Sequence, residues 1–148
     1  MKYFSDNIQL LTFTGDSHVD NHFNYLFRTD KKQKWTNDDT KYDAFGLPWE
    51  KTFSLYSFPE DLKERTLIKN DVKNMIQPYG YENLYMARVE CTNPDIYYWN
   101  KEMLDEMKEL VASIMNNYRD YIIFLVVIHD DQPENYTHFH MLLLGREE

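Results

Sequence analysis

The chain has 148 residues, of which 43% are hydrophobic and 16% aromatic, and its formal net charge is −9. This length predicts one domain, residues 1–148, with enough apolar side chain to close a core, and the single cysteine excludes an internal disulfide. The N-terminal residues show no apolar h-region and no apolar run approaches the roughly 20 residues that span a bilayer, so we expect a cytoplasmic protein without membrane contact.

The first third of the chain predicts a strand, a helix and a loop. Residues 7–14 have strand character, and the turn at 15–17 supplies two possible helix N-caps. The helix that follows is indicated by apolar residues at helical spacing, including Val19, Phe23 and Leu26. Residues 28–50 are polar, carry turn-forming residues and lack periodicity, so we expect a long loop.

The remaining two thirds predict strands and helices in alternation, closed by a hairpin. The expected order is a strand at 52–58, a helix at 60–76, a strand at 82–92, a helix at 94–118, and hairpin strands at 121–128 and 139–144. This order predicts an α+β fold, with an antiparallel or mixed β-sheet and helices packed on one of its faces.

Three of the five histidines lie in the last twenty residues, at positions 129, 138 and 140. His138 and His140 point to one face of a strand because successive side chains alternate, and His129 follows the neighbouring strand of the hairpin. Neutral imidazole is a common ligand of divalent transition metals, and three ligands leave coordination positions open for a substrate oxygen. The pattern predicts a catalytic metal site; the alternative is a set of polar residues on a solvated hairpin.

Two acidic residues are candidates to support these ligands. Asp131, two residues after His129, is placed to accept a hydrogen bond from a ligand histidine, although Asp is equally common as a turn residue here. Glu90, on the predicted strand 82–92, is either a supporting or additional acidic ligand or a solvated residue at a strand end.

The C-terminal hairpin resembles the metal-binding motif of the HUH endonucleases, specifically the plasmid mobilisation relaxases. The shared pattern is an apolar strand, His129-x-Asp131, a short polar loop, and His138-x-His140 within a second apolar strand. The resemblance implies a relaxase or replication-initiator type of fold and a divalent cation, Mg²⁺ or Mn²⁺, that polarises the scissile phosphate of single-stranded DNA. It also implies a tyrosine nucleophile that leaves a 5′-phosphotyrosyl link and a free 3′-hydroxyl, in the DNA of a plasmid, phage or other mobile element.

The same resemblance indicates where the nucleophile lies. Only eight residues follow His140 and none is tyrosine, so only the relaxase order, with the nucleophile near the N-terminus, fits. In that order a tyrosine on an N-terminal helix precedes a basic stretch, which makes Tyr25 the candidate nucleophile and Tyr3 the next. His18 and His22 are four residues apart on the predicted helix, a spacing that can bind metal, and some relaxases use a histidine nucleophile; surface or packing roles are expected instead.

The candidate nucleic-acid contacts follow Tyr25 in the predicted loop. The basic residues offer phosphate contacts, and the aromatic residue among them offers a stacking platform for an unpaired base: Arg28, Lys31, Lys32, Lys34 and Trp35. These residues form a local positive segment on an otherwise acidic chain.

The net charge of −9 favours a different class of function, because most nucleic-acid binding depends on Lys and Arg. The alternative to a nicking enzyme is a catalytically inactive relaxase-like or replication-initiator-like protein that acts as an acidic protein-binding or DNA-mimic module. Its partners would be proteins of a mobile-element or replication complex. A third possibility is a metal-dependent phosphoesterase that uses water as the nucleophile.

Overall fold

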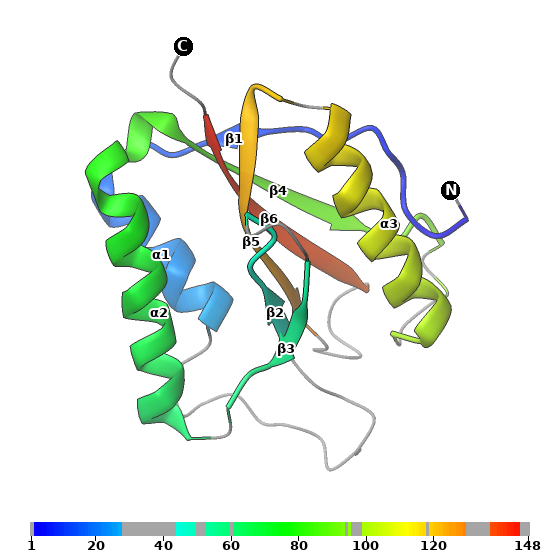
Figure 1. Cartoon of the computed structure of the whole chain (residues 1–148), viewed down its shortest axis with the longest axis horizontal. Coiled ribbons are helices and arrows are strands. Elements are labelled where there is room, and N and C mark those ends of the chain that lie inside the picture. Colours follow the sequence, from blue (N-terminus) through cyan, green and yellow to red (C-terminus); the bar gives the residue numbers. More distant parts are fainter. Residues whose placement is uncertain are drawn as a thin grey trace.

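Six strands form one antiparallel sheet in the computed structural model (Figure 1). The structure describes residues 2–27, 44–49, 53–59, 61–93, 95, 99–117, 119–129 and 137–145. The strands are β1 (Leu11–Thr12), β2 (Ala44–Gly46), β3 (Leu55–Ser57), β4 (Leu84–Glu90), β5 (Tyr121–His129) and β6 (His138–Gly145). Their order in the sheet is β1-β4-β6-β5-β2-β3, so the predicted histidine hairpin, β5 with β6, lies at the centre.

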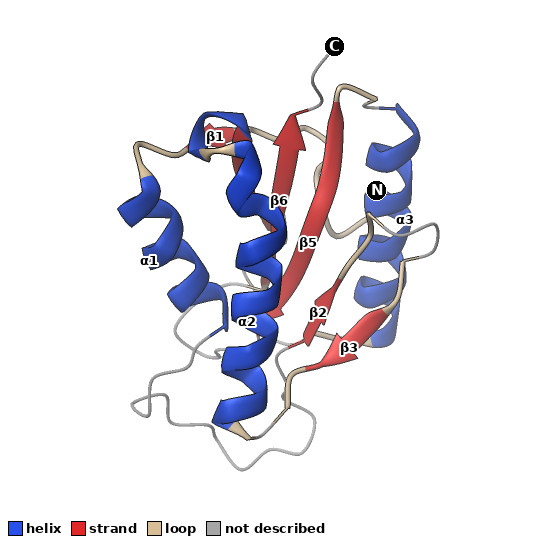
Figure 2. Ribbon diagram, turned by 60° about the vertical axis from the view of Figure 1, so that its left-hand side comes forward, coloured by secondary structure: helices blue, strands red, loops and turns tan. Residues whose placement is uncertain are grey.

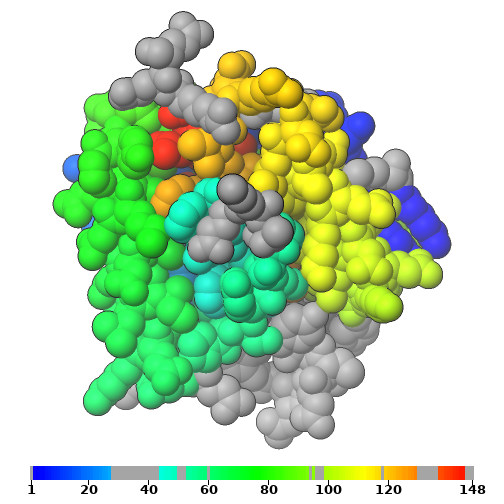
Figure 3. Space-filling view, in the orientation of Figure 1, coloured from blue at the N-terminus to red at the C-terminus, as the bar shows by residue number. Residues whose placement is uncertain are grey.

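Helices cover both faces of this sheet. The helices are α1 (Asp16–Phe27), α2 (Leu62–Ile76) and α3 (Lys101–Asn117), and two short 3₁₀ turns, η1 (Gln77–Tyr79) and η2 (Tyr81–Asn83), connect α2 to β4. Helices α1 and α2 lie on one face and α3 on the other (Figures 1 and 2). In the space-filling view the short strands β2 and β3 lie between α2 and α3 (Figure 3).

The prediction of an α+β fold is confirmed, whereas the prediction that helices cover only one face is wrong. Strands β5 and β6 are buried on both faces, because both are nearly continuous apolar runs. Phe139, Met141 and Leu143 of β6 belong to the core cluster that includes the buried residues of α3. Leu142 and Leu144, which alternate with them, belong to the cluster that includes the buried residues of α1 and α2.

Several elements differ from the sequence prediction, and β1 covers only Leu11–Thr12 of the strand predicted at residues 7–14. Strand β2 lies inside the segment that was predicted as one long loop, and its three residues pair with Val126–Ile128 of β5. Three residues are too few to show the alternation that identifies a strand. Helix α3 begins at Lys101 rather than at Pro94, because the side-chain oxygen of Asn100 accepts a hydrogen bond from Met103 N at 2.9 Å and caps the helix. None of the described helices is long and apolar enough to cross a membrane.

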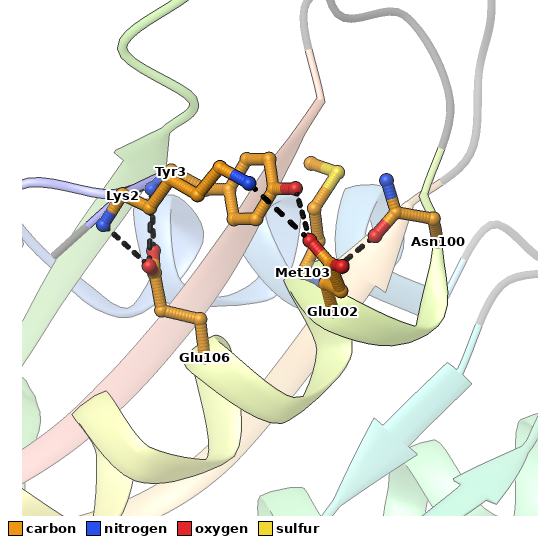
Figure 4. A network of polar contacts seen from close by, with 6 residues as sticks. All are labelled: Lys2, Tyr3, Asn100, Glu102, Met103 and Glu106. Carbon is orange, nitrogen blue, oxygen red and sulfur yellow. Dashed lines mark hydrogen bonds and ion pairs between the residues drawn. The ribbon is translucent and has the colours of Figure 1, made fainter.

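The N-terminal segment is held on α3 by a carboxylate. Glu106 accepts hydrogen bonds from the backbone N–H groups of Lys2, Tyr3 and Phe4, at 2.6, 2.8 and 2.7 Å. The hydroxyl of Tyr3 donates a further hydrogen bond to Glu102 at 2.6 Å (Figure 4). A charged acceptor shared by three successive backbone donors fixes this segment against the α3 side of the sheet.

Candidate metal centre

A β-bulge in β5 brings His129 to the same face of the sheet as the other two histidines. His129 pairs directly with His138, and Val127 pairs with His140, so these side chains share a face. The register shifts between Ile123 and Leu125, which makes Phe124 the extra residue of the bulge. Strict alternation counted from Ile123, which belongs to the α3 cluster, would have turned His129 toward α3 as well.

The three imidazoles meet in a buried cluster. One ring nitrogen from each of His129, His138 and His140 lies within 4.8 Å of the others. The ring centroids are separated by 4.9 Å between His138 and His140, 5.1 Å between His129 and His140, and 6.0 Å between His129 and His138. Their exposed fractions are 0%, 0% and 4% in sequence order. The cluster could hold a metal ion, as the sequence predicted.

Burial keeps His140 neutral. Desolvation, followed by the neighbouring His129 and His138, holds the pKa of His140 well below its ordinary range. The Nε2 atom of His140 is buried and has no hydrogen-bond partner among the described residues. A buried polar atom without a partner costs about 1–3 kcal/mol, and a neutral imidazole nitrogen is the form that binds a metal. The chemistry of His140 therefore fits that of a metal ligand.

The orientation of His129 is fixed by helix α1. Its Nε2 lies 2.9 Å from the carbonyl oxygen of Leu26, in the last turn of α1, where carbonyls lack intrahelical partners. A carbonyl only accepts, so Nε2 carries the hydrogen and Nδ1 carries the lone pair. The ring N–H that does not face the metal typically donates a hydrogen bond of this kind in metal-bound histidines. The sequence predicted this supporting role for Asp131, which lies outside the described residues.

Helix α1 also places Tyr25 against the cluster. The Tyr25 ring stands edge-on to His129 and His140, with centroid distances of 5.3 and 5.4 Å and interplanar angles of 88° and 89°. Tyr25 is nevertheless 39% exposed. The structure thus brings the candidate nucleophile together with two of the three candidate ligands and leaves it open to solvent.

A fourth histidine, His22, lies beside the cluster. Its ring centroid is 6.1 Å from that of His140, and its Nε2 is buried without a hydrogen-bond partner in the described part of the chain. Burial, with a smaller contribution from His18, lowers the pKa of His22 from 6.5 to about 4. The sequence contained a signal for this position: His22 precedes Tyr25 by three residues, a spacing that places both on one side of a helix.

Two charged residues of β4 lie next to the cluster. Arg88 pairs with His140 across β4 and β6, and Glu90 pairs with His138, so both side chains share the face of the histidines. The Arg88 Nε atom is 2.9 Å from Glu90 Oε1. Glu90 is therefore engaged by an arginine and does not join the histidine cluster. Arg88 was missed in the sequence because its neighbourhood depends on strand register alone.

The other predicted residues are distributed away from the cluster or outside the description. Tyr3 packs against the α3-side core, across the sheet from the histidines. His18 accepts a hydrogen bond from Thr14 N at 3.2 Å and contacts Phe13. The predicted nucleic-acid contacts lie outside the described residues: Arg28, Lys31, Lys32, Lys34 and Trp35.

No protein-family model matches this chain, and no curated protein or solved structure matches it significantly.

Proposed function

We propose that this protein is a metal-dependent, HUH-type nicking enzyme that cleaves single-stranded DNA of a mobile element through Tyr25. One observation carries the proposal: the half-exposed Tyr25 ring is in edge contact with both His129 and His140. A nucleophile must reach the phosphate that the metal polarises, and a tyrosine that touches two candidate ligands and is also exposed to solvent fits this role. The resemblance of the hairpin sequence to relaxases agrees with this chemistry.

The three histidines fit a transition metal better than Mg²⁺. His129, His138 and His140 would hold the ion through neutral imidazole nitrogens, whereas Mg²⁺ prefers oxygen ligands. Mn²⁺ or another first-row transition metal is therefore the expected cofactor. A divalent cation bound here supplies Lewis acidity at a phosphate oxygen and holds the phosphodiester in position.

The chain's own residues supply the nucleophile and its positioning. The Tyr25 hydroxyl releases its proton to solvent as its oxygen bonds to phosphorus, and the bond between phosphorus and the 3′ oxygen breaks. The 3′ oxygen leaves as a hydroxyl after gaining a proton from solvent, and the 5′ phosphate stays on the tyrosine. One phosphodiester replaces another, so the step requires neither water as a nucleophile nor an external energy source. The bond from His129 to Leu26 ties the end of α1, and with it Tyr25, to the cluster.

The test is capture of a covalent protein–DNA adduct. Single-stranded oligonucleotides of random sequence, labelled at the 3′ end, are incubated with the protein and Mn²⁺ and resolved on a denaturing gel. The label must be at the 3′ end because the protein becomes attached to the new 5′ end. We expect the adduct to disappear in Tyr25→Phe and His138→Ala and to persist in Tyr79→Phe, a control at a tyrosine that is 46% exposed. An adduct that survives in Tyr25→Phe would overturn the nucleophile assignment.

The net charge of −9 favours the second candidate, an inactive acidic module that binds proteins or mimics DNA. It predicts no adduct, and no stoichiometric Mn²⁺ binding that is lost when His138 is replaced. Cleavage without an adduct would instead indicate a phosphoesterase that uses water. Calorimetry with Mn²⁺, run beside the gel assay, separates these outcomes.

A further inference from the structure

Arg88 has an unusual position for a charged residue. Among the residues of the six described strands it is the only lysine or arginine. It lies on β4 directly beside His140, on the same face of the sheet as the three histidines. Its side chain remains 39% exposed, so the guanidinium is accessible from solvent at the edge of the cluster.

Glu90 orients the Arg88 side chain without using all of its hydrogen-bond donors. The ion pair joins the Arg88 Nε atom to Glu90 Oε1 at 2.9 Å. Glu90 is the ion-pair partner of Arg88 among the described residues, and a guanidinium has five N–H donors in a planar fork, so donors are left for a second acceptor. A terminal guanidinium edge of this kind matches the oxygens of a phosphate, which it can bind through two parallel hydrogen bonds.

A structural role alone explains this arrangement poorly. An exposed ion pair contributes little to stability, because solvent screens it and two side chains must be ordered. A fixed positive charge beside three histidines also disfavours any cation that they bind, by ordinary Coulomb repulsion. Glu90 compensates part of this charge, and an anion that lies between the metal and the guanidinium offsets the remaining repulsion because it contacts both positive groups.

We infer that Arg88, oriented by Glu90, binds a non-bridging oxygen of the phosphodiester next to the metal held by the three histidines. The inference deepens the proposed function and rests on it for the identity of the substrate. Arg88 would thus provide a positively charged phosphate contact on strand β4 of a chain that is acidic as a whole. The ligand class is a nucleic-acid phosphodiester, and Glu90 acts as a positioning residue.

The test measures binding in a protein that cannot react. Tyr25→Phe is the parent, loaded with Mn²⁺, and the probe is a fluorescein-labelled thymidine octamer followed by anisotropy at several salt concentrations. Arg88→Gln is compared with Arg119→Gln, which removes one positive charge from an exposed residue before the opposite end of β5. We expect Arg88→Gln to weaken binding about tenfold, the effect of losing a hydrogen bond to a charged group, and Arg119→Gln to change it less than twofold.

The salt dependence supplies a second readout. Loss of one phosphate contact on a single strand should lower the slope of log affinity against log salt by about 0.7 in Arg88→Gln only. Arg88→Lys, which keeps the charge but loses the planar fork, should fall between the parent and Arg88→Gln. Mn²⁺ affinity, measured by calorimetry without oligonucleotide, should be unchanged or tighter in Arg88→Gln, and this shows that the variant is folded with its histidines intact.

Equal oligonucleotide affinity in Arg88→Gln and Arg119→Gln would overturn the inference, as would a parent that does not bind the octamer at all. If Arg88→Gln does not fold, Arg88→Lys decides the same question by the same comparison. Failure of the proposed function has a different signature. In that case Arg88 is still required for binding, but the protein with Tyr25 forms no adduct.

Discussion

Replacing His140 with leucine is expected to stabilise the metal-free protein and to abolish its stabilisation by divalent metal. His140 is 4% exposed, and its buried Nε2 has no hydrogen-bond partner among the described residues. On the same face of the sheet it is followed by Leu142 and paired with Val127, both of which are fully buried. A leucine at this position would pack beside Leu142 and Val127 and would carry no nitrogen to desolvate.

The expected magnitudes follow from these contacts. Removing an unsatisfied buried polar group should raise the free energy of unfolding by about 1–3 kcal/mol in EDTA. With Mn²⁺ at a hundred times its dissociation constant, the wild type should gain about 2.7 kcal/mol and the variant almost nothing. The His140→Leu variant is therefore expected to be more stable than the wild type in EDTA, and added Mn²⁺ should cancel or reverse this difference. A purely structural histidine would not produce this result.

Urea denaturation followed by circular dichroism, in EDTA and in Mn²⁺, measures the free energy of unfolding of the metal-free protein and its increase with Mn²⁺. His18→Leu is the matched control, because His18 is a histidine of α1 outside the cluster, and its Mn²⁺ increment should equal that of the wild type. A His140→Leu protein that is less stable than the wild type in EDTA would show that the ring nitrogen is satisfied and structural. An unchanged Mn²⁺ increment would show that His140 is not a ligand.

Two further predictions concern residues around the site and at the N-terminus. His22 has its pKa lowered to about 4 in the folded protein, below the unfolded value of 6.5, so the unfolded chain takes up a proton first as the pH falls. The free energy of unfolding in EDTA should therefore decline from pH 6.5 to pH 4. Over this range the wild type should lose up to about 3 kcal/mol more than His22→Phe, as measured by urea titration. Equal losses in the two proteins would contradict the burial of a neutral His22. Glu106→Gln should lower the free energy of unfolding by about 1–2 kcal/mol, because a charged acceptor of three backbone N–H groups is lost, whereas Glu109→Gln on the same helix should change it by less than about 0.5 kcal/mol.

The sequence predicted most elements of the fold because their signals are local. Helix α1 is marked by Val19, Phe23 and Leu26 at helical spacing, and all three are buried. Strands β5 and β6 are marked by apolar runs on either side of a polar turn segment, and they pair as a hairpin. The short strand β2 carried no such signal, since its pairing with β5 is the only feature that makes its three residues a strand.

The sequence also did not predict that helices cover both faces of the sheet. A continuous apolar strand indicates burial on two sides, but the chain order does not specify which helix covers which side. That choice is made by packing, which assigns α3 to the face of Phe139 and assigns α1 with α2 to the face of Leu142.

By itself, the sequence determined the chemistry available to this protein: three histidines on a predicted hairpin, and a tyrosine on an N-terminal helix. Residue types and short spacings are sufficient for that conclusion. Only the tertiary structure decided which groups meet. The bulge at Phe124 turns His129 toward the other histidines, the end of α1 supplies the Leu26 carbonyl and Tyr25, and strand register sets Arg88 beside His140. These contacts join residues distant in the chain, and a run of apolar residues such as Tyr121–Ile128 has no alternation from which a bulge can be predicted.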